Sequence, residues 1–104
     1  MKPTKFAKLA IITTALIGTG VVSASEELAQ SNNCLACHNV DQKLIGPSFK
    51  DIAEKYRDDA AAVDTLVDKV KNGGGGVWGQ IPMPPNPGVS DEDAKTIVEW
   101  VLTM

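Results

Sequence analysis

The chain's only two cysteines and its only histidine lie together in the pentapeptide Cys34-Leu35-Ala36-Cys37-His38. Two thiols about one helical turn apart can each add across a vinyl group of a haem, which gives two thioether links on one edge of the porphyrin. The imidazole of His38, the next residue, is then held where it can ligate the iron. We therefore predict that Cys34 and Cys37 attach one haem c covalently and that His38 is an axial ligand.

Other kinds of site also use a Cys-x-x-Cys pair, and they fit this chain less well. A zinc site normally needs four ligands, and two cysteines with one histidine leave it one short. A structural disulfide between thiols three residues apart would cross-link nothing distant. A thiol-disulfide oxidoreductase would place the pair near a βαβ pattern, and no strand pattern is evident. The oxidoreductase remains the main alternative, and it predicts a colourless protein with titratable thiols.

A second axial ligand has to come from elsewhere in the chain, and the candidates are its three methionines. Met1 lies in an N-terminal leader described below, and Met104 is a terminal residue that we expect to fray. Met83 lies in the segment Ile81-Pro82-Met83-Pro84-Pro85-Asn86. Prolines on both sides hold φ at about −65° and lower the entropy cost of presenting the thioether. We therefore predict Met83 as the sixth ligand, with a core-filling role as the alternative.

The first 24 residues have the layout of a secretory signal peptide. Residues 1–8 carry three lysines and no acidic residue, residues 9–22 are uncharged and largely apolar, and Val22-Ser23-Ala24 offers small residues for cleavage. The apolar run is shorter than the roughly 20 residues that span a bilayer, which makes an uncleaved anchor the less favoured alternative. We predict a cleaved signal peptide over residues 1–24, export to the periplasm and one domain over residues 25–104.

The predicted domain is acidic. All 13 acidic residues follow residue 24, whereas three of the ten basic residues precede it, so residues 25–104 carry an excess of six negative charges. Nucleic acid and anionic membrane surfaces would repel such a protein. We expect no nucleic-acid partner, no stable membrane association and a monomeric state.

Helical spacing with recognisable start signals accounts for most of residues 25–104, so we predict an all-α domain. About four short helices are expected. The first is capped by Ser25 and runs towards the cysteines, and the second follows the capping-box pattern Ser48-Phe49-Lys50-Asp51 to about Tyr56. The third runs from about Ala60 to Lys71 and has one apolar face, made of Val63, Leu66, Val67 and Val70. The fourth runs from Ser90 almost to the C-terminus and has an apolar stripe, made of Ala94, Ile97, Val98 and Val101.

Residues 73–88 are rich in glycine and proline and long for a connection in so small a domain. We expect this loop to wrap around something bulky.

Together with several later segments, the pentapeptide resembles the small bacterial class I cytochromes c. The resemblance covers nearly all of residues 25–104 and rests further on Lys43–Pro47, Lys71–Gly73, Gly76–Gly79, Ile81–Asn86 and Trp100–Leu102. It implies the class I cytochrome c fold, with its short helices wrapped around one covalently bound haem.

The resemblance also implies roles for residues around the two ligands. The Pro47 carbonyl accepts the His38 Nδ1 proton, and Trp78 points its indole N–H towards a haem propionate. Asn86 hydrogen-bonds near the sulfur of the sixth ligand. Lys69 stands where such proteins often place an arginine, and a solvated helix lysine is its alternative role. Pro47, Trp78 and Asn86 would orient or tune a ligand.

An iron with both axial positions filled has no site for a substrate. The resemblance therefore implies a soluble periplasmic electron carrier rather than an enzyme, which transfers one electron at a time between partner proteins. These partners would be a respiratory-chain donor and a terminal reductase or oxidase, of the nitrite reductase type. An enzyme or gas sensor with an open sixth position is the alternative, and it predicts tight binding of carbon monoxide to the reduced protein.

Overall fold

The computed structural model describes residues 23–104, which form four α-helices and one 3-10 turn. The elements are α1 (Ala24–Ser31), η1 (Cys34–Ala36), α2 (Phe49–Lys55), α3 (Ala62–Asn72) and α4 (Asp91–Val101). Within residues 23–104 the only β-structure is a pair of isolated bridges, so the predicted all-α fold is confirmed. The predicted signal peptide lies outside the described residues except for Ser23 and Ala24, and its cleavage stays a prediction.

Two helices begin at the serines that the sequence indicated. Ser48 caps α2 and Ser90 caps α4, and each side-chain oxygen accepts a hydrogen bond at 3.1 Å from a backbone N–H three residues on, that of Asp51 or Asp93. This bond satisfies one of the N–H groups that the first turn of a helix leaves without a partner. The acidic side chains in these first turns add a favourable interaction with the helix dipole.

Helix α1 begins two residues earlier than expected. Ser23 has an extended backbone, and its hydroxyl accepts the Glu26 N–H at 3.1 Å. The expected cap at Ser25 is therefore wrong, because Ser25 already lies within the first helical turn. Both serines precede the same pair of glutamates, and the sequence pattern does not distinguish them.

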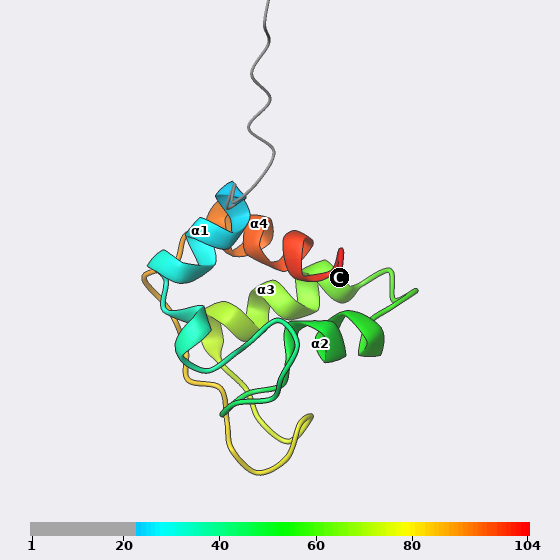
Figure 1. The fold of residues 1–104 in the computed structure, drawn as a ribbon. Helices are drawn as coiled ribbons and strands as arrows, with labels where there is room; N and C mark the ends of the chain where they lie inside the picture. The colour runs from blue at the N-terminus through cyan, green and yellow to red at the C-terminus, as the bar shows by residue number, and fades with distance from the viewer. Residues whose placement is uncertain (1–22) are drawn as a thin grey trace, which may run out of the picture.

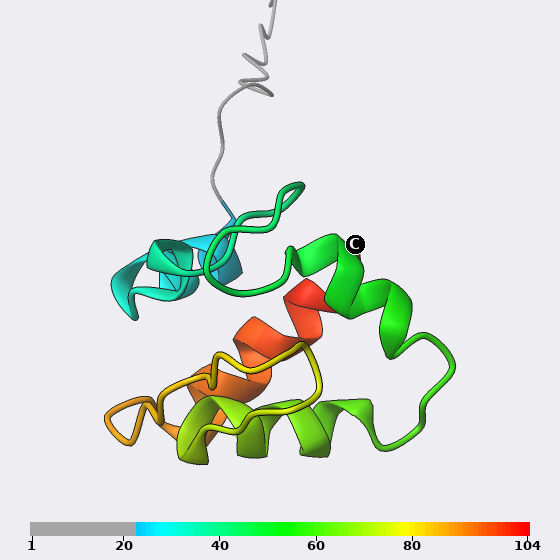
Figure 2. The same cartoon turned by 90° about the horizontal axis from the view of Figure 1, so that it is seen from below.

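Helix α4 packs against each of the other three α-helices and supplies much of the core. Its predicted apolar stripe is buried along its whole length, at Ala94, Ile97, Val98 and Val101. Figure 2 shows α4 lying between α1 and α3, with α2 near its C-terminal end. The last helix of the chain therefore holds the other three together.

The apolar face of α3 is divided between two neighbours. Leu66 and Val70 line a large cavity, whereas Val63 and Val67 line a groove that α3 shares with the start of α4. The spacing of these residues predicted a single apolar face, and the structure turns its two edges towards different surroundings. Half of this face is therefore available to whatever occupies the cavity.

Two long connections link the helices, residues 37–48 and residues 73–90. The first connection and the yellow part of the second lie below the helices in Figure 1, and the rest of the second runs up the left side to the start of α4. Each connection contains one isolated β-bridge: His38 pairs with Lys43 in the first connection, and Met83 pairs with Gly74 in the second. The backbone of each predicted iron ligand is thus fixed by its own bridge. No helix among residues 23–104 is both long and apolar enough to cross a membrane.

Replacing Ser48 by alanine tests the cap of α2. Ser48 is only 1% exposed, so Ser48→Ala leaves the Asp51 N–H without its partner in a site that water reaches poorly. We expect the free energy of unfolding of the haem-loaded protein to fall by about 1 kcal/mol in denaturant titrations. Ser31→Ala removes an exposed hydroxyl that donates to the Glu27 carbonyl, and it should change stability by less than about 0.5 kcal/mol. Equal losses in the two variants would contradict the capping role.

Candidate functional site

A cavity of about 350 Å³ lies between the two long loops and helices α2, α3 and α4. Its lining brings together all four residues predicted to hold a haem: Cys34, Cys37, His38 and Met83. Cavities that bind cofactors and small molecules have volumes of about 300–1,000 Å³, so the size is suitable. The loop that we expected to wrap around something bulky, residues 73–88, lines this cavity with residues between Gly74 and Pro84.

The imidazole of His38 is oriented by contacts from three neighbours. Its Nδ1 lies 2.7 Å from the Pro47 carbonyl oxygen. A carbonyl oxygen can only accept a hydrogen bond, so Nδ1 carries the proton and Nε2 keeps its lone pair for a metal. The Phe49 ring stacks on the imidazole, with ring centroids 5.3 Å apart and planes 24° apart. Gly46 lies so close that a Cβ there would come within 2.7 Å of His38 Cε1.

The turn between His38 and α2 places the Pro47 carbonyl beside the ring. The Gly46 N–H donates to the Cys37 carbonyl at 2.8 Å, which closes the turn onto the end of the pentapeptide. The Phe49 N–H donates to the Asn39 carbonyl at 2.9 Å, which fixes the start of α2 against the same turn. The carbonyl that accepts from His38 is therefore held between two backbone hydrogen bonds.

The two cysteines lie in η1 and at its end, beyond the end of α1. Asn33, with φ of 62°, ends the helical path, and the N–H groups of Cys37 and His38 then donate to the Cys34 carbonyl at 3.2 and 2.9 Å. Both thiols are free and half-buried. Burial raises the pKa of the Cys34 thiol, and the neighbouring Cys37 adds to the rise.

The raised pKa of Cys34 bears on the thiol-disulfide oxidoreductase alternative. The attacking cysteine of such an enzyme reacts as a thiolate and has a lowered pKa, usually at a helix N-terminus beside strands. Here the pKa of the first thiol is raised instead, and residues 23–104 contain no strand. These observations disfavour the alternative.

Met83 is half-buried in the cavity lining and is held there by its backbone. The Gly74 N–H donates to the Met83 carbonyl at 3.1 Å, and the Met83 N–H donates to the Gly74 carbonyl at 2.7 Å. Gly73, with φ of 74°, lies so close that a Cβ there would come within 2.6 Å of the Met83 carbonyl oxygen. The end of α3 and the methionine loop are thus packed backbone to backbone, and this packing requires glycine at position 73.

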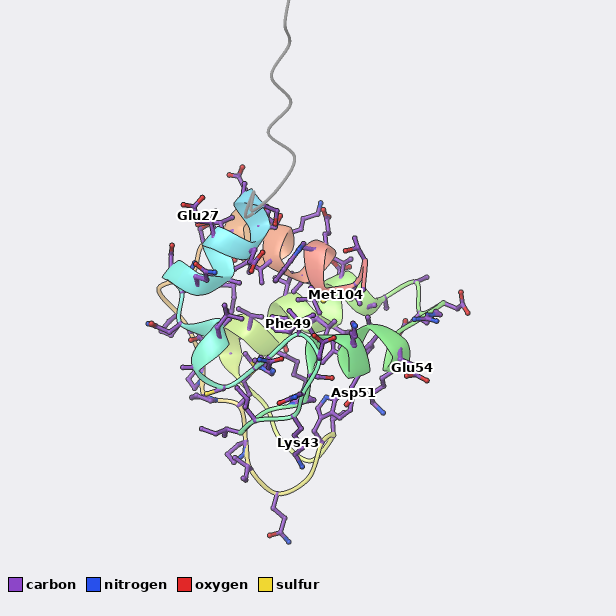
Figure 3. All side chains as sticks on the ribbon, viewed as in Figure 1. Glu27, Lys43, Phe49, Asp51, Glu54 and Met104 are labelled. Atoms are coloured by element: carbon purple, nitrogen blue, oxygen red, sulfur yellow. The ribbon has the colours of Figure 1, made fainter. Side chains whose placement is uncertain are left out.

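Met104 lies elsewhere, and the expectation that it frays is wrong. It packs against the core cluster that includes Phe49 and Val101, and its N–H donates to the Val101 carbonyl at 3.2 Å. Figure 3 shows it at the end of α4, away from the loops at the bottom of the view. Its apolar side chain extends the buried stripe of α4 by one turn. Met83 is therefore the only methionine of residues 23–104 that lines the cavity.

The structure brings Trp78 and Lys69 to the cavity. Trp78 lines it and is 40% exposed, with Lys55 Nζ lying 5.4 Å from the centroid of its ring. Lys69 is half-buried in the lining, and its side chain lies against Gly74. The contact of the Trp78 indole with a propionate stays a prediction.

Asn86 lies outside the cavity lining. Its Nδ2 donates to the carbonyl oxygens of Val70, at 3.1 Å, and Pro84, at 3.2 Å, and its backbone N–H also donates to Val70, at 3.0 Å. Asn86 therefore ties the proline segment that follows Met83 to the last turn of α3. A hydrogen bond from Asn86 near the Met83 sulfur stays a prediction.

Charge at the cavity differs in sign from charge over the domain. Lys43 and Lys69 line the cavity and Lys55 lies over Trp78, whereas Asp51 is the one acidic residue of the lining. Within residues 23–104 none of these three lysines forms an ion pair; the ion pairs are Lys50–Asp41, Lys71–Asp91 and Lys95–Glu99. The acidic excess read from the sequence thus does not describe this face.

Phe49 is the site residue that the sequence analysis missed. The sequence pattern predicts only that Phe49 follows the cap of the second helix, although Phe49 lies two residues after the carbonyl that orients His38. An aromatic residue so close to that carbonyl was the available signal. Its contact with the imidazole depends on how the turn folds back, which spacing along the chain does not reveal.

The residues of the cavity fit a covalently held haem. Two thiols, an imidazole with a free Nε2 and a thioether face one space, and the rest of the lining is largely apolar. Several of its large apolar side chains, Ile45, Val77, Trp78 and Ile81, are exposed in the described chain, which suits contact with an apolar ring. The same donor set, histidine and methionine, ligates the iron in cytochromes c.

Known proteins of one kind match this chain. A family model described as Cytochrome c matches residues 22–104. Cytochrome c-552 of Nitrosomonas europaea is 53% identical over 91 residues, which are 88% of each chain. Cytochrome c-551 of Pseudomonas aeruginosa is 44% identical over 105 residues, which cover 99% of this chain and 98% of that protein. The crystal structure of wild-type N. europaea cytochrome c552 aligns with a TM-score of 0.73 at 57% identity, over 74% of this chain and 95% of that one.

Gly73→Ala tests the packing behind Met83. We expect it to lower the free energy of unfolding of the haem-loaded protein by more than about 1 kcal/mol, because an L-residue is strained at positive φ and its Cβ would overlap the Met83 carbonyl. Gly88→Ala is the matched control in the same loop, since its Cβ would meet nothing within 4 Å. Thermal or denaturant unfolding of both variants measures the difference. A loss of the same size in Gly88→Ala would show that the stability falls when any glycine of the loop is replaced, and not because of the contact between Gly73 and the Met83 carbonyl.

Proposed function

The chain belongs to the cytochrome c family and is a single-haem electron carrier, and we propose that His38 and Met83 are the two axial ligands of its iron. Cys34 and Cys37 hold the haem covalently. The observation that carries the proposal is that His38 and Met83, from two loops far apart in the sequence, line one cavity with both cysteines. When bound there, the haem supplies an iron that accepts and releases one electron.

His38 contributes a nitrogen whose orientation and protonation are set in advance. The 2.7 Å hydrogen bond to the Pro47 carbonyl keeps the proton on Nδ1 and makes the ring a stronger donor at Nε2. The closely packed Gly46 limits movement of the Cε1 edge. The ligand is thus in position without a change of tautomer when the iron changes its oxidation state.

Met83 contributes a neutral sulfur from a segment with little freedom. Its backbone is bonded to Gly74 on both sides, and Asn86 ties the following prolines to α3. A neutral thioether favours ferrous iron over ferric iron, so the reduction potential is high among haem proteins. With side chains in both axial positions no site remains for a substrate, in accord with carriers of the cytochrome c-551 and c-552 type, which are not enzymes.

Trp78 and Lys69 bind the propionate groups of the haem. Both line the cavity, and both carry N–H donors suited to a carboxylate. Lys55, over the Trp78 ring, adds positive charge beside the same edge. Lysine binds a propionate as a point charge rather than through the bidentate grip of an arginine.

The carrier exchanges electrons with redox partner proteins. Its site of action is the periplasm after removal of residues 1–24, and its partners are a respiratory-chain donor and an acceptor of the nitrite reductase or oxidase type. The composition of residues 1–24 supports export. The lysines around the cavity favour partner surfaces with acidic groups near the point of contact.

Loss of both thioether links should prevent stable folding. The described core is small, and large apolar side chains face the cavity, so most of the stabilisation of the loops depends on the cofactor. We expect the variant Cys34→Ser with Cys37→Ser to give little helical circular dichroism and a low yield. A stably helical, haem-free variant would overturn this dependence.

The assignment of Met83 is tested by substitution at both methionines of the domain. Met83→His should keep the haem and lower the reduction potential by a measurable part of the roughly 0.8 V that axial ligands span. Met83→Ala should open the iron to carbon monoxide and cyanide. Redox titration and ligand-binding spectra on the loaded proteins measure both effects.

Met104→Ala is the matched control, because Met104 packs in the core away from the cavity. It should lose stability yet keep the potential and the closed iron. If Met83→Ala behaves like the unchanged protein in both assays, Met83 is not the sixth ligand.

A further inference from the structure

The ring of Phe49 stands between His38 and Trp100. It stacks on the His38 imidazole at 5.3 Å, and the Trp100 ring meets it edge-on at 5.5 Å with an interplanar angle of 72°. Phe49 is 3% exposed and belongs to the core cluster with Ala29, Ile97 and Val101. Three aromatic rings thus run from the cavity into the core, and Figure 3 shows Phe49 in the interior beneath α4.

The hydrogen bond to Pro47 does not by itself fix the plane of the imidazole. It restrains one atom, Nδ1, and a hydrogen bond to a carbonyl oxygen tolerates a broad range of angles. The second side-chain torsion of histidine also has broad minima. A flat neighbour at stacking distance excludes the tilts that the hydrogen bond allows, and Phe49 is the only aromatic ring stacked on His38 within residues 23–104.

Phe49 is itself held from two sides. Its backbone starts α2, where the Ser48 cap and the hydrogen bond to the Asn39 carbonyl fix its position. The edge of Trp100 restrains its ring from α4. Edge-to-face pairs of this kind contribute beyond their buried area, so the orientation is preferred over a rotated one.

We propose that Phe49 is a positioning residue that fixes the plane of the His38 imidazole, with Trp100 as the support that transmits the position of α4 to this ring. The proposal rests on axial ligation by His38. An aliphatic side chain of similar volume fills the same space without presenting a flat face, so the requirement is for a ring and not only for bulk.

The test uses the oxidised, haem-loaded protein, because the plane of an axial imidazole sets the rhombic splitting of the electron paramagnetic resonance spectrum and the pattern of haem methyl shifts in proton NMR. Phe49→Leu should shift the g-values and broaden or reorder the methyl resonances. Phe49→Tyr keeps the ring and should restore the pattern of the unchanged protein. Leu28→Ala, at a partly buried position against the same core cluster but outside the cavity lining, should lower stability without moving either signature.

Unchanged g-values and methyl shifts in Phe49→Leu would overturn the proposal, as would equal shifts in Leu28→Ala. If Phe49→Leu yields no loaded protein, Trp100→Leu decides. Shifted g-values and methyl resonances in Trp100→Leu support the role, and an unchanged spectrum overturns it. Cyanide binding to the unchanged protein separates this proposal from the ligand assignment. An iron that binds cyanide as readily as Met83→Ala contradicts the methionine ligand, whereas a closed iron with unshifted Phe49→Leu spectra contradicts only the positioning role.

Discussion

The hydrogen bond between His38 Nδ1 and the Pro47 carbonyl oxygen decides which ring nitrogen faces the cavity. Much of the chain between the pentapeptide and α2 serves to place that carbonyl. Gly46 closes the turn onto Cys37 and leaves no Cβ to push the imidazole away, and Ser48 then starts the helix that brings Phe49 under the ring. A neutral histidine that donates its Nδ1 proton has no proton on Nε2, so Nε2 keeps a lone pair. The position of a backbone carbonyl thus decides which nitrogen of the His38 ring can bind a metal.

The proposed second ligand, Met83, is held by similar backbone contacts in the other loop. Met83, like His38, belongs to an isolated β-bridge, and a glycine next to that bridge approaches too closely for any Cβ. Gly73 packs on the Met83 carbonyl in the way that Gly46 packs on the imidazole. Loops without regular structure are usually mobile, and these close backbone contacts are what make two loops rigid enough to present ligands.

The distribution of apolar side chains is the physical reason for the predicted dependence of folding on the cofactor. Helix α4 buries its apolar stripe against α1, α2 and α3, and three residues of that stripe, Ile97, Val98 and Val101, also line the cavity. Leu66 and Val70 of α3 line the same cavity. In a domain this small the protein core alone supplies little stability, so the group in the cavity is a part of the core as well as the site of electron transfer.

Local sequence patterns predict a large part of the fold and of the candidate site. The serines at the starts of α2 and α4, the stripe of α4 and the chemistry of the pentapeptide all depend on neighbours within a few positions, and sequence spacing is enough to read them. The sequence predicts Met83 as the sixth ligand of the iron, because the chain has few candidate ligands and prolines flank this one. All of these predictions use residue types and short-range spacing, and none of them depends on how the helices pack together.

Other features came from contacts between parts of the chain that spacing does not relate. Phe49 meets His38 only because the turn folds back, Asn86 bonds to Val70 on another element, and Met104 finds the core instead of fraying. The lysines around the cavity reverse locally the charge that the composition gives for the whole domain. The sequence by itself determined which chemical groups the protein has and where helices α2 and α4 begin. The tertiary structure decided which groups meet, because hydrogen bonds, stacking and charge act over a few ångströms in space, whatever the separation along the chain.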